Sequence, residues 1–158
     1  MKNPEITVRK SDYTNAEDLN AIGALINVYI EDEMGGGKIL DQQQQKQLTE
    51  ALRQHPKSIV LLACTGEIRC GMLVAFENFS TFTVRPMINI HDVIVMKEHR
   101  GKGVGRALLE AIVKIADERR CSRITLEVRA DNQVAQCLYK SVGFDAPIPE
   151  MYYWRKNR

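Results

Sequence analysis

The chain has 158 residues, of which 44 % are hydrophobic, so it can bury a core without disulfides or metals, and its length fits one domain over residues 1–158. Its 22 basic and 20 acidic side chains leave a formal net charge of +2, which argues against a nucleic-acid partner held by a strong basic field. No apolar run approaches the roughly 18 residues of a membrane helix, and the first residues lack the apolar stretch of a signal peptide. We therefore expect a cytoplasmic globular protein without a membrane partner.

The first part of the chain predicts two helices with a flexible segment between them. Thr14 and Glu17 have the spacing of a capping box and precede apolar residues at helical spacing, so a first helix is predicted over about 15–30. Gly35–Gly37 then interrupt the pattern, because glycines lose the most backbone entropy on ordering. Asp41 is placed to cap the second helix.

From residue 58 the pattern changes to that of strands. Ile59–Cys64 and Ile68–Phe79 flank a short turn and predict an antiparallel hairpin, and Ile88–Val95 predicts a further strand. An amphipathic helix over about 103–119 and a strand over Ile124–Val128 follow. A strand, a helix and a strand in this order require a parallel, right-handed crossover.

The predicted fold class is therefore α/β (α+β), with a central mixed sheet and helices on its faces. A short helix over 133–142 and a last strand over Tyr152–Arg155 complete the predicted elements. Sheets of this kind bind ligands at the carboxyl ends of their parallel strands. The residues that follow Ile88–Val95 are the first candidates for a binding site.

The cysteines give no sign of a metal site. No pair of the four has C-x-x-C spacing, and only three histidines could join them as ligands. Reduced thiols that pack as small hydrophobic side chains explain them. No metal is therefore expected at Cys64, Cys70, Cys121 or Cys137.

The segment Arg100–Arg106 has the composition of a phosphate-binding loop. It reads Arg-Gly-Lys-Gly-Val-Gly-Arg and lies between a predicted strand and a predicted helix. Glycines let backbone N–H groups approach an anion closely, and a helix N-terminus adds partial positive charge. The segment is not a Walker A loop, and a dinucleotide fingerprint would need glycine where Arg106 stands. Taken alone, the segment leaves open a phosphate loop or a glycine-rich turn with solvated basic residues.

Four stretches in this order and spacing resemble the motifs of one family. Val93–Val95, followed after five residues by Gly101–Gly105, is similar to the core motif of the GNAT family of N-acetyltransferases. Leu126–Asn132 and Leu138–Phe144 are similar to its second motif. The resemblance covers about residues 88–145 and implies a single-domain GNAT fold in which two parallel strands splay apart. It also implies acetyl-CoA as the co-substrate, and a homodimer is one expected state because dimers are frequent in that family.

The resemblance further implies how acetyl-CoA binds. Backbone N–H groups of the glycine-rich segment would bind its pyrophosphate, and its pantetheine arm would run along the strand before that segment. Asn132 and Tyr139 would flank the thioester. The cofactor-binding residues implied in this way are Val93, Ile94, Val95, Arg100, Gly101, Lys102, Gly103, Val104, Gly105, Arg106, Asn132 and Tyr139.

Acetyl transfer to an amine needs an acid and a base. The departing thiolate has an ordinary pKa of about 8.5 and needs a proton, which a phenol can supply. Tyr139 stands at the family's acid position. An amine with a pKa of about 10.4 is almost fully protonated at pH 7 and has to lose a proton before it attacks. Glu127, His91 and Asp92 are the candidate bases, and ordered water is the fourth alternative.

The segment between the first two helices covers the acceptor site in that family. Here Glu31, Asp32 and Glu33 precede the glycine run and would attract a cationic amine, although a solvated helix end is the alternative. The residues 89–120 and 151–154 look most like the small-molecule and polyamine branch. The predicted function is N-acetyl transfer from acetyl-CoA to a small cationic amine. A protein N-terminal or lysine acetyltransferase and a non-catalytic acyl-CoA binding module are the alternatives.

Overall fold

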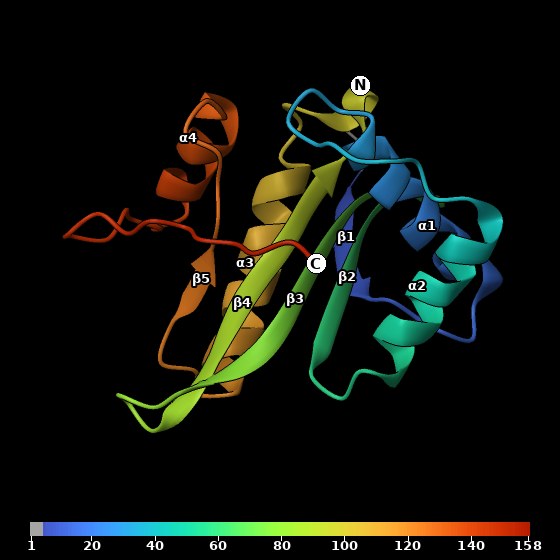
Figure 1. Cartoon of the computed structure of the whole chain (residues 1–158). Helices are drawn as coiled ribbons and strands as arrows, with labels where there is room; N and C mark the ends of the chain where they lie inside the picture. The colour runs from blue at the N-terminus through green and yellow to red at the C-terminus, as the bar shows by residue number, and fades with distance from the viewer. Residues whose placement is uncertain (1–4) are drawn as a thin grey trace.

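A computed structural model describes residues 5–158 of the chain as one sheet flanked by helices (Figure 1). The predicted helices and the strands of the predicted hairpin and crossover are all present. In chain order the elements are β1 (Ile6–Lys10), α1 (Ala16–Ile30), α2 (Gln42–Gln54), β2 (Ser58–Thr65), β3 (Ile68–Ser80), β4 (Arg85–Val95), the 3-10 turn η1 (Lys97–His99), α3 (Val104–Glu118), β5 (Ile124–Leu126) and α4 (Gln133–Ser141).

The sheet has the strand order β1-β2-β3-β4-β5, and it is mixed as predicted. The first four strands pair antiparallel, whereas β4 and β5 are parallel. Their parallel pairing begins at Ile88 with Ile124 and ends at Ile90 with Leu126. Beyond Ile90, β4 continues to Val95 without a partner among the described residues on its β5 side. The two parallel strands therefore separate toward their carboxyl ends, as the resemblance implied.

A β-bulge in β4 decides which side chains face each layer of helices. Ile90 and Asp92 pair with consecutive residues of β3, so His91 is the extra residue. Ile90 and Val93 pack in the core on the α3 side. The ring of His91 meets Phe76 of the opposite core edge-on, with 4.8 Å between the ring centroids. Because neighbouring side chains of a strand alternate, Asp92, next to Val93, also faces the side of α1.

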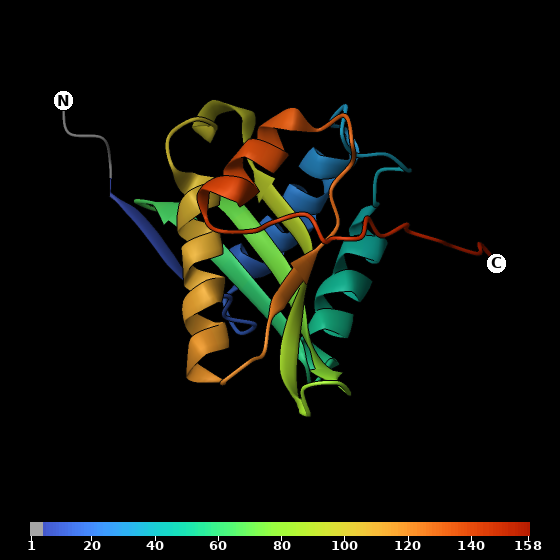
Figure 2. The ribbon, with the colours of Figure 1, turned by 90° about the vertical axis from the view of Figure 1, so that its left-hand side faces the viewer.

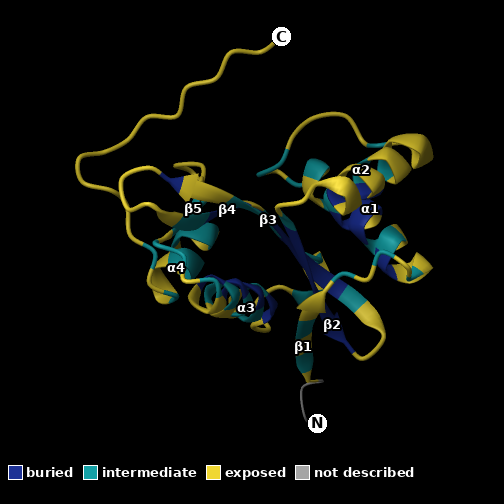
Figure 3. Cartoon of the chain, turned by 90° about the horizontal axis from the view of Figure 1, so that it is seen from below, coloured by how far each residue is buried: buried dark blue, intermediate teal, exposed yellow. Residues whose placement is uncertain are grey.

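Two hydrophobic cores lie on the two faces of the sheet, as expected for helices on both faces. Figure 3 shows α3 on one side of the strands and α1 with α2 on the other. Each core is formed by alternate side chains of the same strands, so β2 and β3 read as nearly continuous apolar runs. The fully buried residues include Leu61, Leu73, Leu108, Leu109 and Ile112 on the α3 side and Ile22, Leu62 and Met72 on the α1 side.

A buried carboxylate fixes the start of α1 to the sheet. Asp18 is fully buried and accepts hydrogen bonds from Arg9 Nη2 at 2.8 Å, Arg69 Nε at 3.1 Å and the Asp12 N–H at 2.9 Å. These partners lie on β1, on β3 and in the loop before the helix. The Arg9 guanidinium holds the pKa of Asp18 well below its usual range, so the carboxylate stays charged.

The N-terminal part of the fold differs from the sequence prediction in two ways. β1 was not predicted. It forms because all of it pairs antiparallel with residues 61–65 of β2. The N-cap of α1 is Asn15 rather than Thr14, so the predicted capping box is wrong. The Asn15 side chain accepts from the N–H of Glu17 at 2.8 Å, whereas Thr14 donates to Asp12 instead. The cap at Asp41 is confirmed, in a capping box with Gln44.

The C-terminal part also differs from the prediction. β5 ends at Leu126, two residues before the predicted end, and Tyr152–Arg155 form no strand. Aromatic residues favour strands only where a neighbouring strand takes their backbone hydrogen bonds, and no described strand does so here. Four consecutive large apolar side chains stay exposed as a result, namely Met151, Tyr152, Tyr153 and Trp154.

The described residues contain neither a metal-binding cluster nor a helix able to span a membrane. The cysteines are free thiols, and no group of three or more His, Cys, Asp or Glu side chains within residues 5–158 is placed to hold a metal ion. None of the helices in that part of the chain has the length and apolarity to cross a membrane. The separated ends of β4 and β5 are the place that the sheet itself offers for a ligand.

Candidate active site

The loop that leads into α3 offers a row of free backbone donors. Gly103 is the N-cap of α3 and has φ +90°, a left-handed conformation that glycine adopts without strain. The N–H groups of residues 101–106 donate no hydrogen bond to any backbone carbonyl of residues 5–158. They lie at the helix N-terminus, whose partial charge is positive. This loop, residues 100–106, is called the anion loop below, because an anion is what such donors bind.

The three basic side chains of the anion loop have different surroundings. Lys102 is exposed and has no salt-bridge partner among the described residues. Arg106 donates to the hydroxyl and the carbonyl of Ser141 at the end of α4, which Figure 2 shows beside the start of α3. Arg100 binds Asp32 and the carbonyl of Val95. The charge available to a bound anion is therefore greatest at Lys102.

Tyr139 lies at the separation of the two parallel strands. Its ring packs against the α3-side core and lies 6.1 Å from the ring of Phe144. Burial raises the pKa of the Tyr139 hydroxyl, and the neighbouring phenol of Tyr29 and the negative charge of Asp92 raise it further. A phenol in these surroundings keeps its proton at neutral pH, as a general acid must before it donates.

Asp92 is a candidate base whose carboxyl is half-buried. Burial raises the pKa of its carboxyl, and His91 opposes that shift only as the smaller effect. No hydrogen-bond donor or cation among residues 5–158 contacts the carboxylate. A carboxylate of this kind binds a proton more readily than an exposed one does.

The two other candidate bases lie in different surroundings. The His91 ring packs against Phe76 and is exposed to solvent. Because Phe76 belongs to the α1-side core, His91 faces the α1 side of the sheet. Glu127 follows the end of β5 and is exposed. It lines a cavity of about 470 Å³ together with Tyr139, Gln136 and the C-terminal residues 151–153. The structure thus brings Tyr139 together with Asp92 and with Glu127.

The remaining predicted residues take part in local contacts. The Asn132 side chain caps α4 by accepting from the Ala135 N–H at 3.1 Å. Asp32 forms an ion pair with Arg100, with 2.8 Å between Oδ2 and Nη2. Glu31 is the C-cap of α1, and it lines a second, smaller cavity with residues of η1. Of the three predicted acceptor residues, Asp32 is the one whose charge is already neutralised.

Sequence reasoning missed Tyr29. It lies in the last turn of α1, and the negative charge of Asp92 raises its pKa after burial does. The phenol of Tyr29 is in turn near enough to raise the pKa of Tyr139, so the three groups lie around one space. At helical spacing within an apolar stripe, Tyr29 is indistinguishable from a core residue, and only the contact with β4 reveals its place.

Comparison with known proteins decides the family. The model of the Acetyltransferase (GNAT) family matches residues 23–144 of the chain. The chain belongs to this family. The match confirms the resemblance read from the motifs, and it includes the anion loop, β4, β5 and α4.

Curated relatives match over about half of the chain. One is a ribosomal protein bS18-alanine N-acetyltransferase of Escherichia coli, 36 % identical over 84 residues, which are 52 % of this chain and 55 % of the relative. Another is a thialysine N-epsilon-acetyltransferase of Sus scrofa, 35 % identical over 78 residues, which are 49 % of this chain and 45 % of the relative. The chain thus spans about half the length of the curated relatives it matches.

Solved structures share the fold over nearly the whole chain. A crystal structure of a probable acetyltransferase matches with a TM-score of 0.81 at 24 % identity, over 98 % of both chains. An aminoglycoside acetyltransferase from an uncultured soil metagenomic sample matches with a TM-score of 0.76 at 16 % identity, over 96 % of this chain and 97 % of that chain. At these identities the likeness concerns the fold.

Proposed function

We propose that this protein is an N-acetyltransferase that moves the acetyl group of acetyl-CoA directly to an amine, and that the amine is a small cationic molecule. One observation carries the proposal. The free N–H groups of the anion loop, the separated ends of β4 and β5, and the half-buried side chains of Tyr139 and Asp92 meet at one end of the sheet. Membership of the GNAT family supports acetyl-CoA as the donor.

The residues present fit the cofactor. Acetyl-CoA supplies an acetyl thioester and a pyrophosphate. The N–H groups of residues 101–106 and the charge of Lys102 would hold the pyrophosphate. Residues 91–95 of β4 have no partner strand on the β5 side, so their backbone can offer strand-like hydrogen bonds to an extended amide chain.

Tyr139 is the proposed acid. Since burial and nearby negative charge raise its pKa, the hydroxyl is protonated over the whole neutral range. It can therefore donate to a thiolate as that group leaves, which prevents the reverse attack. Packing of its ring against Phe144 and the α3-side core holds the hydroxyl in place.

Asp92 is the proposed base. Its carboxylate is half-buried and unpaired, so a cationic amine that binds beside it gains a favourable interaction and can transfer a proton to it. Glu127 is the alternative base, because it shares a cavity with Tyr139. The two differ in environment, because Glu127 is exposed whereas Asp92 is half-buried.

The acceptor class follows from charge and from the relatives. The carboxylates of Asp92 and Glu127 lie near Tyr139, and no described cation is paired to Asp92. Glu31 adds negative charge at the cavity between α1 and η1. They favour a positively charged acceptor. Among the relatives, one is named for an alanine of a ribosomal protein and another for thialysine, a small amine. A protein N-terminus is therefore the second acceptor class to test.

The experiment is a measurement of thiol release from acetyl-CoA over a panel of acceptors. The panel includes a polyamine, lysine-like amino acids, an aminoglycoside and a peptide with N-terminal alanine. Turnover with the small cationic amines supports the proposal, and preference for the peptide moves it to protein acetylation. Tight binding of acetyl-CoA without turnover on any acceptor identifies a non-catalytic acyl-CoA binding module.

A further inference from the structure

The segment Glu31–Ile39, called the acceptor segment here, is held to α1 by local contacts. The N–H of Asp32 donates to the carbonyl of Tyr29 at 3.1 Å, and the N–H of Gly35 donates to that of Asp32 at 2.9 Å. Gly35 lies so close to α1 that a Cβ there would stand 1.8 Å from the Tyr29 oxygen. Gly36 and Gly37 have nothing within 4 Å of a Cβ, so this part of the segment lies in open surroundings.

A single side chain connects the acceptor segment to the anion loop. Arg100 Nη2 donates to Asp32 Oδ2 at 2.8 Å, and Arg100 Nε donates to the carbonyl of Val95 at 3.0 Å. Asp32 Oδ1 accepts from the Met34 N–H at 3.0 Å. Within residues 5–158, this is the one hydrogen-bonded link from the acceptor segment to anything beyond α1. The Asp32 side chain is 13 % exposed and that of Arg100 46 %, so the pair is partly shielded from water.

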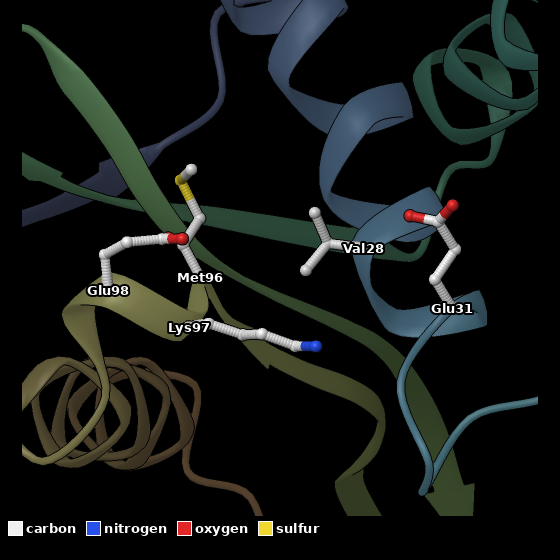
Figure 4. A pocket seen from close by; sticks show the side chains of 5 residues that line it. All are labelled: Val28, Glu31, Met96, Lys97 and Glu98. Carbon is white, nitrogen blue, oxygen red and sulfur yellow. The ribbon is translucent and has the colours of Figure 1, made fainter.

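Apolar packing does not replace this link. A cavity of about 240 Å³ separates the end of α1 from η1, with Val28 and Glu31 on one side and Met96, Lys97 and Glu98 on the other. Figure 4 shows Val28 and Lys97 extending into the space between the helix and the turn, whereas the carboxylate of Glu31 turns away from it. The far end of the acceptor segment is held separately, because Leu40, the next residue, is hydrogen bonded to the side chain of Asn27 in both directions. Because few atoms meet across the cavity, the start of the segment depends on the Arg100–Asp32 pair for its link to the end of β4.

We infer that Arg100 is a positioning residue for the acceptor, acting through Asp32, and that it does not itself bind the cofactor phosphate. Its guanidinium joins the end of β4 to the acceptor segment and so fixes where Asp32 and the following Glu33 stand relative to the site. Asp32, already paired, then contributes position and no net attraction for the amine. The inference rests on the proposed function, because it assigns the acceptor segment to amine binding.

The inference separates the effects on amine and on cofactor. Asp32→Asn keeps the shape of the side chain and removes its charge, so we expect the KM for a cationic amine to rise about fivefold, with kcat and the Kd of acetyl-CoA within about twofold. Arg100→Ala should give the same pattern. The swapped double variant, Asp32→Arg with Arg100→Asp, should recover most of the lost KM, since it restores the pair. Glu50→Gln breaks a comparable exposed pair with Arg53 on α2 and is the matched control.

Three results would overturn the inference. A tenfold weaker acetyl-CoA affinity in Arg100→Ala, with normal amine KM in Asp32→Asn, would make Arg100 a cofactor ligand. A raised KM in Asp32→Asn that the swap does not reverse would make Asp32 a direct amine ligand. Unchanged constants in all variants would make the pair an ordinary surface ion pair.

Hydrogen exchange gives a readout that does not require turnover. If the wild-type protein released no thiol with any amine, the proposed function would fail. The positioning role would then be judged by exchange alone. Arg100→Ala should speed exchange of the Gly35 amide severalfold, while Glu50→Gln leaves it unchanged. Equal exchange rates in wild type and Arg100→Ala would contradict the role of Arg100 by themselves.

Discussion

Replacement of Gly103 by valine tests the anion loop. Gly103 has φ +90° and ψ −1°, and a Cβ built there meets only Ile6 Cδ1, at 3.8 Å. The cost of a side chain is therefore backbone strain rather than collision with the protein. For a residue with a Cβ, left-handed backbone costs roughly 1–2 kcal/mol, and a β-branched side chain adds to this. The loop is expected to relieve the strain by leaving this conformation, after which its N–H groups no longer converge.

The expected result is a tenfold or larger loss of acetyl-CoA affinity, which corresponds to about 1.4 kcal/mol. Isothermal titration calorimetry measures it, and thermal unfolding by circular dichroism shows that the fold persists. Gly66→Val is the matched control, because Gly66 has φ +60° and equally open surroundings at the tip of the β2–β3 hairpin, away from the loop. That variant should lose stability but no affinity. Unchanged affinity in a folded Gly103→Val variant would refute the role of the loop.

Further predictions concern the carboxylates of Asp92 and Asp18 and the exposed ring of Trp154. Burial raises the pKa of Asp92, so as the pH is lowered kcat/KM should begin to fall at a higher pH than an ordinary aspartate would cause. Asp92→Asn should abolish this acidic limb of the pH profile. A limb that persists in the variant excludes Asp92 as the base. Arg9 holds the pKa of Asp18 low, so the stability from this pair is fully present above the ordinary value and is lost only as the pH falls through the lowered one. Asp18→Asn should therefore lower the free energy of unfolding in urea at pH 7 by about 2–3 kcal/mol, and a change under about 0.5 kcal/mol would contradict the buried clamp. Trp154, the single tryptophan, is 87 % exposed, so its fluorescence should resemble that of free indole in water and be quenched by acrylamide. Blue-shifted emission would instead show that the C-terminal residues pack against a surface.

The parts of the fold that could be predicted are those coded by local pattern. The apolar periodicity of α3 and the glycines of the anion loop lie within one stretch of chain, so sequence alone placed the strand, the loop and the helix correctly. Asp41 was likewise recognised as a cap, because both partners of its capping box lie within one turn. Such features depend on neighbours a few residues away.

The parts that could not be predicted depend on distant contacts. β1 exists because it pairs with β2, more than 50 residues further along, and Tyr152–Arg155 form no strand because no described strand accepts them. The Arg100–Asp32 pair joins residues 68 positions apart, so the two side chains could be assigned only to separate sites from sequence. The bulge at His91, which turns Asp92 toward α1, is equally invisible in the strand pattern.

The most direct test of the central claim is the kcat of thiol release from acetyl-CoA in Tyr139→Phe, measured with the amine that the wild type prefers. The variant keeps the ring that packs against Phe144 and loses only the hydroxyl. Tyr13→Phe is its control, because the Tyr13 hydroxyl is buried without a hydrogen-bond partner among the described residues and its loss should leave kcat unchanged. General acid catalysis is worth about 10²- to 10⁴-fold, so the kcat of Tyr139→Phe should fall by a factor in that range, while the Kd of acetyl-CoA stays within a few-fold. If Tyr139→Phe kept more than about half of the wild-type kcat, with chemistry shown to be rate-limiting, Tyr139 would not be the acid and the proposed catalytic arrangement would be wrong.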